Sequence, residues 1–516
     1  MTQNSDFDIA IVGSGFAGSL LAMIARRLGR SVVLLEKSSH PRFAIGESST
    51  PLANLLLEEL ATRYDLPRLL PLCKWGPWQR AYPEIGCGLK RGFSFYHHQA
   101  GQPFGQAPNR SDQLLVSASP RDEIADTHWY RPDFDHFFVR EAQNLGVEYL
   151  DQISLDAPIF DGDGVSLRGI CNGKTVSIRA RFLFDATGPR GFLHRALDLG
   201  ERVSPRLATQ ALYSHFSGVR HMESQLAPRV EAPPYPVDDA ALHHVFEGGW
   251  MWVLRFNNGL TSAGVAASET LANELSFEDG APAWSQLLER FPSVKQQFEN
   301  AIPQHPFVHA KQLSFRSNVV VGPHFALLPS AAGFVNPLFS MGFPLALLGV
   351  SLLAKLLDED WQTARFESNL QLYAAQTRAD LDIAEELIAA LSANMGDFEV
   401  FKNLSLLYFT AAIYSETARR LGKPEMAGGF LMHDNPRFGQ AARRCFVTAQ
   451  RPLSAWEKHE LIAQIEAIIE PFDLAGLAQK QRGNWYPVLA DDLFDAKEKV
   501  GATREELESL LQRAGF

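Results

Sequence analysis

The chain contains 516 residues, of which 46% are hydrophobic and 21% charged, so it can form two or three domains around substantial cores and is neither disordered nor fibrous. Its 48 basic and 59 acidic residues give a net charge of -11. No block of basic residues is interleaved with aromatic ones, which excludes the groove that a nucleic-acid-binding protein needs.

The N-terminal residues predict a dinucleotide-binding βαβ unit. A buried-strand pattern from Asp8 to Val12 leads into the glycine motif GSGFAG, a helical stretch follows, and a second strand ends at Glu36. In such a unit Gly13 permits the tight turn, Gly15 lets the backbone approach a pyrophosphate at the helix N-terminus, and Gly18 lets the helix pack on the strand. The carboxylate of Glu36 can accept hydrogen bonds from ribose hydroxyls.

The stretch CGLKRGFSFYHH at 87–98 is rich in aromatic residues but contains Lys90 and Arg91. Neighbouring residues of a strand point to opposite faces, so one of the two is expected to be buried while the other meets solvent. A lysine in a strand usually extends its amine to the surface. The following loop at 99–113 and the proline-rich connection at 227–239 are candidate lids.

The remaining chain indicates a protein without a membrane span, a disulfide framework or a metal site. The four cysteines are far apart and form no CxxC pair, as in reduced cytoplasmic proteins, and the N-terminus has no signal-peptide pattern. The apolar stretch from Phe325 to Leu357 is interrupted by prolines and is predicted to form a buried helix. We therefore expect a cytoplasmic protein that contacts no membrane.

Two further segments indicate that the dinucleotide is FAD. PRFAIGES at 41–48 follows the second strand, and FDATG at 184–188 closes a later strand. Together with Arg131 in the segment YRPDF, they resemble the flavoprotein monooxygenases and their relatives. No second GxGxxG motif is visible downstream, which favours a separate NAD(P)H-dependent flavin reductase as the source of reduced FAD.

Three segments narrow the resemblance to the flavin-dependent halogenases. GWMWVLRF at 249–256 is similar to their WxWxIP segment but has Leu254 and Arg255 in place of isoleucine and proline. The stretch 328–342, LPSAAGFVNPLFSMG, resembles the segment beside the isoalloxazine and the halide, although Pro329-Ser330-Ala331 replaces the usual GDA. CGLKRGFSF resembles the lysine strand of phenol-type members, above all those that chlorinate phloroglucinol. The resemblance extends to about residue 350.

The resemblance implies an α/β fold with three parts. These are an FAD-binding, GxGxxG (Rossmann-like) domain of the flavoprotein monooxygenase type, an inserted β-sheet substrate domain, and a C-terminal helical subdomain. We expect the core at 1–357, with substrate-domain segments at about 75–130 and 200–315. Helical periodicity dominates from about residue 358, so the helical subdomain at 358–516 is expected to cover the substrate site.

The resemblance also implies a reaction. In this family a flavin hydroperoxide, formed from reduced FAD and dioxygen, oxidises chloride or bromide to hypohalous acid, which passes along a tunnel to a lysine and halogenates a small aromatic substrate. Lys90 would be that catalytic lysine, acting as an ammonium that hydrogen-bonds hypohalous acid or as a neutral amine that forms a haloamine. Burial favours the neutral amine. Tryptophan-type members carry a glutamate where Phe339 stands, so its absence favours an electron-rich phenol or pyrrole.

The residues expected at each part of the site follow from these motifs. The cofactor-binding residues are Gly13, Ser14, Gly15, Phe16, Ala17, Gly18, Glu36, Lys37, Arg42, Ile45, Gly46, Glu47, Arg131, Asp185, Gly188, Gly333 and Phe343. The halide is expected at Ser340, Met341 and Gly342, with backbone N–H groups at a helix N-terminus as donors. The tunnel and substrate residues are Trp250, Trp252, Pro337, Phe339, Phe93 and Phe95, with both tryptophans on one face of a strand.

Other readings stay open at this point. An FAD-dependent aromatic monooxygenase would hydroxylate the substrate, and Arg255 in place of proline is compatible with that activity. A flavoprotein reductase that acts on an alkene and an inactive flavin-binding protein are the remaining alternatives. A phenol substrate also calls for a base, and the sequence singles out none of His97, His98, His243 and His244.

Overall fold

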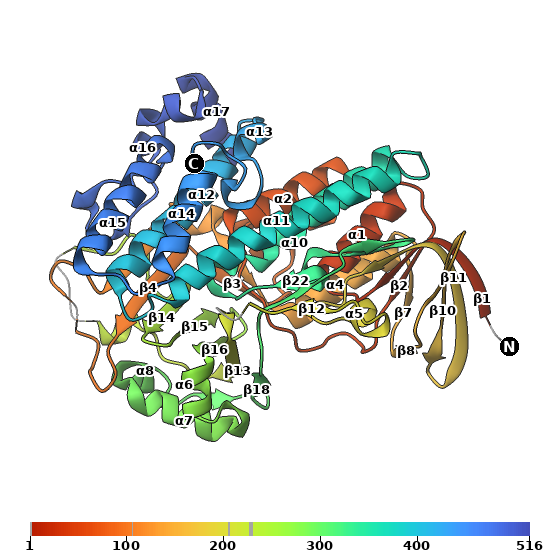
Figure 1. Cartoon of the computed structure of the whole chain (residues 1–516), viewed down its shortest axis with the longest axis horizontal. Coiled ribbons are helices and arrows are strands. Elements are labelled where there is room, and N and C mark those ends of the chain that lie inside the picture. The colour runs from red at the N-terminus through yellow and green to blue at the C-terminus, as the bar shows by residue number, and fades with distance from the viewer. Residues whose placement is uncertain (1–2, 106, 205–206, 227–230) are drawn as a thin grey trace.

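The computed structural model describes residues 3–105, 107–204, 207–226 and 231–516. Part of the proline-rich connection that we considered as a lid, residues 227–230, lies outside the described residues. Figure 1 shows two β-sheets side by side, with a group of C-terminal helices above the second sheet. The long helices α10 (Gly342–Glu359) and α11 (Phe366–Ser392) run from these C-terminal helices towards the first sheet.

The first sheet carries the predicted βαβ unit. The strands β1 (Gln3–Val12), β2 (Val32–Leu35) and β11 (Lys174–Asp185) are parallel neighbours. The full order is β20-β21-β11-β1-β2-β7, with β10 also paired with β11, and with β8 and β9 paired with β10. The other strands are β7 (Glu148–Leu150), β8 (Ile153–Leu155), β9 (Ile159–Asp161), β10 (Gly164–Cys171), β20 (Val321–Gly322) and β21 (Phe325–Leu327). The carboxyl ends of β1 and β11 are in register, so the glycine motif and the FDATG turn meet at one edge.

The second sheet has the order β17-β13-β16-β15-β14-β4-β5-β23, with β18 beside β13. Its strands are β4 (Gly92–His98), β5 (Gln113–Ser117), β13 (Thr209–Ser217), β14 (Ala241–Phe246), β15 (Gly249–Arg255), β16 (Thr261–Ser268), β17 (Ile302–Pro303), β18 (Val308–Ala310) and β23 (Trp485–Tyr486). All except β23 come from the two segments expected for the substrate domain. The strand β23 lies in the C-terminal region and pairs with β5, so that region is not wholly helical.

The remaining strands form two smaller sheets. The strands β3 (Cys87–Lys90) and β6 (Asp126–Trp129) form an antiparallel pair, and β12 (Glu201–Arg202), β19 (Phe315–Ser317) and β22 (Gly333–Phe334) form a three-stranded sheet. The stretch 87–98 is therefore two strands in different sheets, separated at Arg91. Our expectation that either Lys90 or Arg91 meets solvent is wrong, because the strand ends between them and both are buried. Arg91 pairs with Asp122 at 2.6 Å.

Helices cover the first sheet and fill the space above the second one (Figure 1). The N-terminal ones are α1 (Phe16–Arg27), α2 (Pro51–Arg63), α3 (Trp75–Ala81), α4 (Arg131–Asn144) and α5 (Phe192–Ala196). The central ones are α6 (Glu269–Glu274), α7 (Ala281–Arg290), α8 (Pro292–Gln297) and α9 (Pro329–Ala332). The C-terminal ones are α12 (Phe398–Arg420), α13 (Pro424–Ala427), α14 (Gly439–Ala449), α15 (Ala455–Ile469), α16 (Ala490–Asp495) and α17 (Arg504–Ala514).

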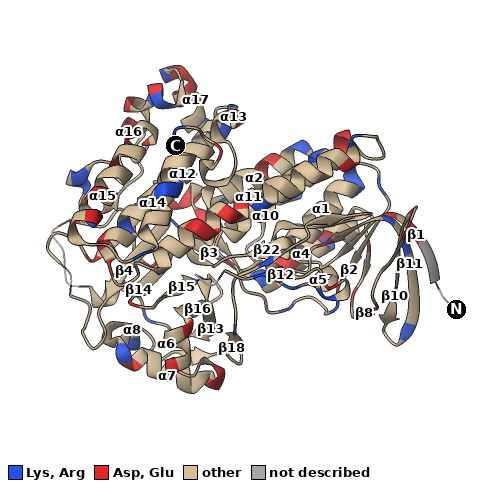
Figure 2. Cartoon of the chain, viewed as in Figure 1, with Lys and Arg blue, Asp and Glu red and all other residues tan. Residues whose placement is uncertain are grey.

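The apolar stretch near residue 340 forms a core helix. By length and composition, the helical segment Leu338–Glu359 could cross a membrane, because an 18-residue stretch of it has a mean hydropathy of 1.7. However, 61% of that stretch is buried inside the protein. Pro329 begins α9 and Pro337 directly precedes a short turn, so the residues before α10 form short elements, whereas Pro344 lies in the first turn of α10. Figure 2 shows acidic and basic residues interspersed along the helices.

Candidate active site

The glycine motif forms the close packing that its spacing predicts. Gly13 has a φ of +102°, and a Cβ on it would lie 2.6 Å from the backbone of Ala186 in the FDATG turn. A Cβ on Gly18 would lie 2.1 Å from the carbonyl oxygen of Gly13. Only glycine fits at both positions, because backbone atoms cannot move aside as a flexible side chain can.

The N-terminus of α1 is suited to an anionic group. Gly15 precedes the helix without a side-chain cap, and the first turn holds no acidic residue. A Cβ on Gly15 would lie 3.5 Å from Nη2 of Arg131 and 3.8 Å from Nη2 of Arg42. A helix N-terminus beside two guanidinium groups is a donor set for a pyrophosphate.

Glu36 lies at the end of β2, where a dinucleotide-binding unit holds the ribose. Its carboxylate accepts hydrogen bonds from the backbone N–H of Ser14 at 3.1 Å and from the hydroxyl of Ser14 at 2.9 Å. Burial alone would raise the pKa of Glu36, but Arg42, 3.6 Å away, and these hydrogen bonds lower it below its usual value. The side chain is therefore an ionised acceptor. Together with the α1 terminus, it fits an adenine dinucleotide.

Several other predicted cofactor residues build this end of the sheet. Arg131 at the start of α4 forms a bidentate pair with Asp135 at 2.8 Å and donates to the carbonyl of Gly46 at 2.9 Å. It also donates to the carbonyl of Ile45 at 3.3 Å. Phe16 and Phe343 pack edge to face, with ring centroids 5.0 Å apart. These contacts hold the PRFAIGES segment against α1 and α4.

The structure gives the six remaining predicted cofactor residues other surroundings. Asp185 is fully buried and accepts hydrogen bonds from the backbone N–H groups of Thr187, in its own turn, and of Leu193, in α5. Lys37 is exposed, and Gly333 packs against Leu381 on α11. Glu47 forms a buried pair with His215 of β13, with Oε1 and Nε2 2.7 Å apart. Gly188 has a φ of +79° and Ala17 is buried in α1.

Lys90 is completely buried, contrary to the usual position of a strand lysine. Its Nζ donates to the hydroxyl of Ser48 at 2.9 Å and to the carbonyl of Ser49, and it lies 3.9 Å from the ring centroid of Phe93. Burial lowers the pKa of Lys90 to about 7, against the opposing effect of Asp126. A neutral amine is therefore accessible near neutral pH.

Asp126 is the acidic partner of Lys90 and was not found by sequence reasoning. It lies opposite Lys90 in the β3–β6 pair, and its Oδ1 accepts a hydrogen bond from Asn54 at 2.7 Å. Its Oδ2 has no partner among the described residues. Burial raises the pKa of Asp126 to about 7, and Lys90 opposes that rise. Both groups therefore change their charge near neutral pH, and each influences the other.

The predicted tunnel residues form one aromatic wall. Trp250 and Trp252 lie on one face of β15, with ring centroids 5.7 Å apart, while Met251 packs on the opposite side of the sheet. Phe95 lies 5.7 Å from Phe339. Phe93 stacks 6.2 Å from Phe95, and Pro337 directly precedes the turn that carries Phe339. The alternation of β15 thus places both tryptophans as the sequence predicts.

Of the four candidate histidines, His243 is the one in this wall. Its ring stacks on Phe95 at 4.5 Å and lies 5.3 Å from Trp250. Burial, together with Lys90, lowers the pKa of His243 to about 3, so the ring is neutral. His98 and His244 instead bond to each other at 2.9 Å, and His97 stacks on Phe398.

Arg255, where the sequence departs from the family pattern, does not touch the aromatic wall. Its guanidinium donates to Asp238 at 3.3 Å and to the carbonyl of Val219 at 2.9 Å. Leu254, by contrast, lies in the cluster that contains both tryptophans. The arginine therefore replaces proline on the face of β15 that is turned away from the tunnel residues.

The predicted halide segment has an unusual backbone. Phe339 and Ser340 both adopt left-handed conformations, with φ of +60° and +58°, which non-glycine residues rarely do. The hydroxyl of Tyr408 on α12 donates to the carbonyl of Phe339 at 3.0 Å, and the two rings stack at 4.3 Å. The turn delivers Met341 and Gly342 to the start of α10, where no side chain caps the helix. A Cβ on Gly342 would meet nothing within 4 Å, so this position borders open space.

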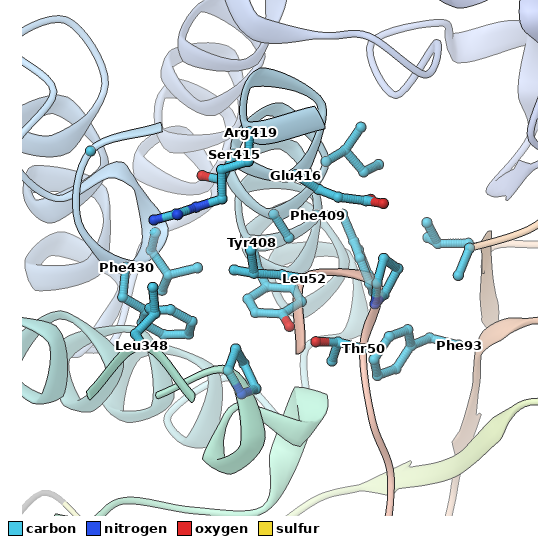
Figure 3. A pocket seen from close by; sticks show the side chains of 18 of the residues that line it. Thr50, Leu52, Phe93, Leu348, Tyr408, Phe409, Ser415, Glu416, Arg419 and Phe430 are labelled. Carbon is cyan, nitrogen blue, oxygen red and sulfur yellow. The ribbon is translucent and has the colours of Figure 1, made fainter. Parts of the chain in front are cut away.

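An apolar pocket with an empty volume of about 730 Å³, part of it open to solvent, adjoins Lys90. Figure 3 shows Phe93 and Thr50 at one end of this pocket and Arg419 at the other. Phe93, whose ring contacts the Lys90 amine, also lines the pocket. The lining residues include Thr50, Pro51, Leu52, Leu348, Tyr408, Phe409, Ser415, Glu416, Arg419, Phe430 and Leu431. Within the described residues, no group of three or more His, Cys, Asp or Glu side chains could hold a metal ion.

Comparison with known proteins identifies the family. A family model described as tryptophan halogenase matches residues 127–393, and one described as an NAD(P)-binding Rossmann-like domain matches residues 11–54. The chain is 31% identical to tetracycline 7-halogenase of Kitasatospora aureofaciens over 386 residues, which is 71% of this chain and 67% of that protein. The chain belongs to the flavin-dependent halogenases.

Further similarities agree with this assignment. The halogenase is 29% identical to monodechloroaminopyrrolnitrin halogenase PrnC of Pseudomonas fluorescens over 426 residues, covering 80% of this chain and 72% of PrnC. Its fold matches that of halogenase PltM in complex with phloroglucinol and FAD, with a TM-score of 0.80 over 92% of this chain and 99% of that one, at 24% identity.

The family settles three expectations from the sequence. The protein is an FAD-dependent halogenase, so the predicted cofactor FAD and the use of a halide are confirmed. The readings as a hydroxylase, an alkene reductase or an inactive flavin-binding protein are set aside. The α/β fold with a Rossmann-like domain is confirmed as well.

Proposed function

We propose that this halogenase uses Lys90 to present oxidised halogen to an electron-rich, phenolic small molecule in the pocket beside Phe93. The observation that carries the proposal is the position of Lys90. Its amine is fully buried and lies 3.9 Å from the ring centroid of Phe93, which also lines an apolar pocket. An amine at this place can hold hypohalous acid by a hydrogen bond or form a haloamine.

The residues around the glycine motif are assigned to holding FAD. The N–H groups at the start of α1 and the guanidinium groups of Arg42 and Arg131 would bind the pyrophosphate, and Glu36 would accept the ribose hydroxyls. When bound in its reduced form, FAD would activate dioxygen, which supplies the oxidising equivalents and the oxygen atom that convert chloride or bromide to hypohalous acid.

The start of α10 is assigned to the halide. The backbone N–H groups of Met341 and Gly342 are donors at an uncapped helix N-terminus beside open space, and a helix N-terminus favours an anion. The left-handed turn at Phe339 and Ser340 aims these groups away from the preceding chain. Backbone donors suit a halide because they bring no competing acceptor.

The aromatic wall is assigned to excluding water. Phe95, Trp250, Trp252 and Phe339 are all buried, and their rings bring no hydroxyl, thiol or carboxylate group to the wall. Neutral His243 is the polar member of the wall. Exclusion of water limits loss of the reactive species before it reaches Lys90.

The substrate class follows from Phe339 and from the pocket lining. Phe339 is uncharged and occupies the position at which tryptophan-type halogenases carry a glutamate. The walls of the pocket are mainly apolar. Both features favour a substrate that is activated by its own hydroxyl groups. We further propose that reduced FAD comes from a separate NAD(P)H-dependent flavin reductase and that the reaction takes place in the cytoplasm.

The proposal is tested by product mass. The protein is incubated with FAD, a flavin reductase, NADH, dioxygen and either bromide or chloride, together with a panel of phenols and matched aryl methyl ethers. We expect a halogen isotope pattern in products from phenols and at least tenfold less product from the ethers. Equal conversion of both sets would overturn the phenolic assignment, and an added oxygen atom without halogen would contradict halogenation of this panel.

A further inference from the structure

One cation in the pocket beside Phe93, the guanidinium of Arg419, has no hydrogen-bond or ion-pair partner among the described residues. Arg419 lines the pocket at the end opposite Phe93. Figure 3 shows the side chains of Arg419 and Glu416 pointing in opposite directions from α12. In the part of the chain that the structure describes, the guanidinium of Arg419 forms no hydrogen bond and no ion pair within 4.0 Å. Its neighbour Arg420 is fully engaged, because it pairs with Glu416 at 2.7 Å.

The surroundings of Arg419 leave its charge unsatisfied. The acids that act on it are Glu59 on α2 and Asp380 on α11, and neither lies within ion-pair distance. Asp380 already accepts hydrogen bonds from the N–H of Phe430 at 2.9 Å and pairs with His433 at 3.1 Å. Burial lowers the pKa of Arg419, which the two acids only partly offset. A half-buried guanidinium without a partner favours an anionic ligand.

We propose that Arg419 binds an acidic group of the substrate, in the first instance a carboxylate, while the ring to be halogenated lies at the Phe93 end of the pocket. This inference rests on the proposed function for the location of the reacting ring. A planar guanidinium can donate two parallel hydrogen bonds to a carboxylate, which would fix the distance between the ring and the acid.

The dimensions of the pocket define the shape of such a substrate. Phe409 and Arg419 lie on the same helix and are separated by about 15 Å along its axis, and the empty volume is about 730 Å³. The substrate class is therefore an elongated, electron-rich aromatic acid, in which several bonds or a second ring separate the acid from the reacting ring.

The test compares acids with their neutral esters. A series of ω-(3,5-dihydroxyphenyl)alkanoic acids of increasing chain length and their methyl esters is titrated into the full-length protein by calorimetry, without turnover. We expect the longer acids to bind roughly 10- to 100-fold more tightly than their esters. In Arg419→Gln this preference is lost while ester affinity stays within about twofold, and Arg419→Lys keeps part of it. Arg378→Gln removes an exposed charge outside this pocket and should keep the full preference for acids.

The outcomes separate this inference from the proposed function. Equal affinity of acids and esters for the natural chain, or a preference for acids that persists in Arg419→Gln, would overturn the role of Arg419. Halogenation of the esters with no preference for acids would leave the phenolic function intact and reject only the acid site. Tighter binding of acids through Arg419 without any halogenated product would support the acid site and count against the proposed reaction.

Discussion

Lys90 and Asp126 lie opposite each other on β3 and β6, and both are buried. Each residue shifts the pKa of the other towards the charged form, while burial shifts both towards the neutral form. The result is a pKa of about 7 for both groups. This relationship sets the protonation state of the proposed catalytic amine at the pH of the cell.

Replacing Asp126 by asparagine should move the pH dependence of halogenation. The substitution keeps the shape of the side chain but removes the charge that raises the pKa of Lys90, so this pKa falls further. We expect the step in the pH–rate profile that is due to Lys90 to move to lower pH by roughly one unit. Single-turnover rates between pH 5 and 9 measure it, and an unchanged profile would show that Asp126 does not act on Lys90.

The same variant should change stability with a defined sign. Between about pH 4 and pH 7 the folded protein holds a proton on Asp126 that the unfolded chain has released, so this group makes the native state less stable as the pH rises. Asp126→Asn removes that loss. The Tm of the variant minus the Tm of the natural chain should therefore increase from pH 4 to pH 7. A constant difference would contradict the raised pKa of Asp126.

Tyr408 should support the halide segment through one hydrogen bond. Tyr408→Phe removes the bond to the carbonyl of Phe339, which should lower stability by about 1 kcal/mol and reduce halogenation roughly tenfold, because the left-handed turn loses its support. Tyr414→Phe is the matched control, since Tyr414 on the same helix donates to the carbonyl of Lys499 at the same 3.0 Å. It should show the loss of stability without the loss of activity.

Gly342→Ala should separate folding from anion binding. A Cβ at Gly342 meets nothing within 4 Å, and alanine is favoured over glycine in a helix, so stability should be unchanged or rise by up to about 1 kcal/mol. The methyl group would occupy the open space beside the proposed halide donors. We expect the KM for bromide to rise at least fivefold. Gly105→Ala, where a Cβ is also free of contacts, should leave it unchanged.

Structural features that depend on the local sequence could be predicted. The packing at Gly13 and Gly18 follows from motif spacing, and the shared face of Trp250 and Trp252 follows from the alternation of a strand. The burial of Lys90 was expected only from resemblance to a family, because a lysine in a strand carries no local signal for burial.

Residues that act through long-range pairing could not be predicted. Ser48, Ser49 and Asp126 meet Lys90 only because β3 pairs with β6 and the PRFAIGES segment lies beside β6. The alternation of a continuous strand failed at Arg91 because the chain leaves one sheet and enters another there. Arg419 lacks any motif, and its free guanidinium is visible only once α12 is packed on the pocket.

The central claim, that the Lys90 amine hands halogen to the substrate, is tested most directly by Lys90→Ala. The variant and the natural chain are compared under identical conditions with reduced FAD, dioxygen, bromide and a phenol that the natural chain brominates, after flavin binding has been measured for both. The account predicts that FAD binds with unchanged affinity and that brominated product falls at least 100-fold. Brominated product at the rate of the natural chain, with FAD bound, would contradict it.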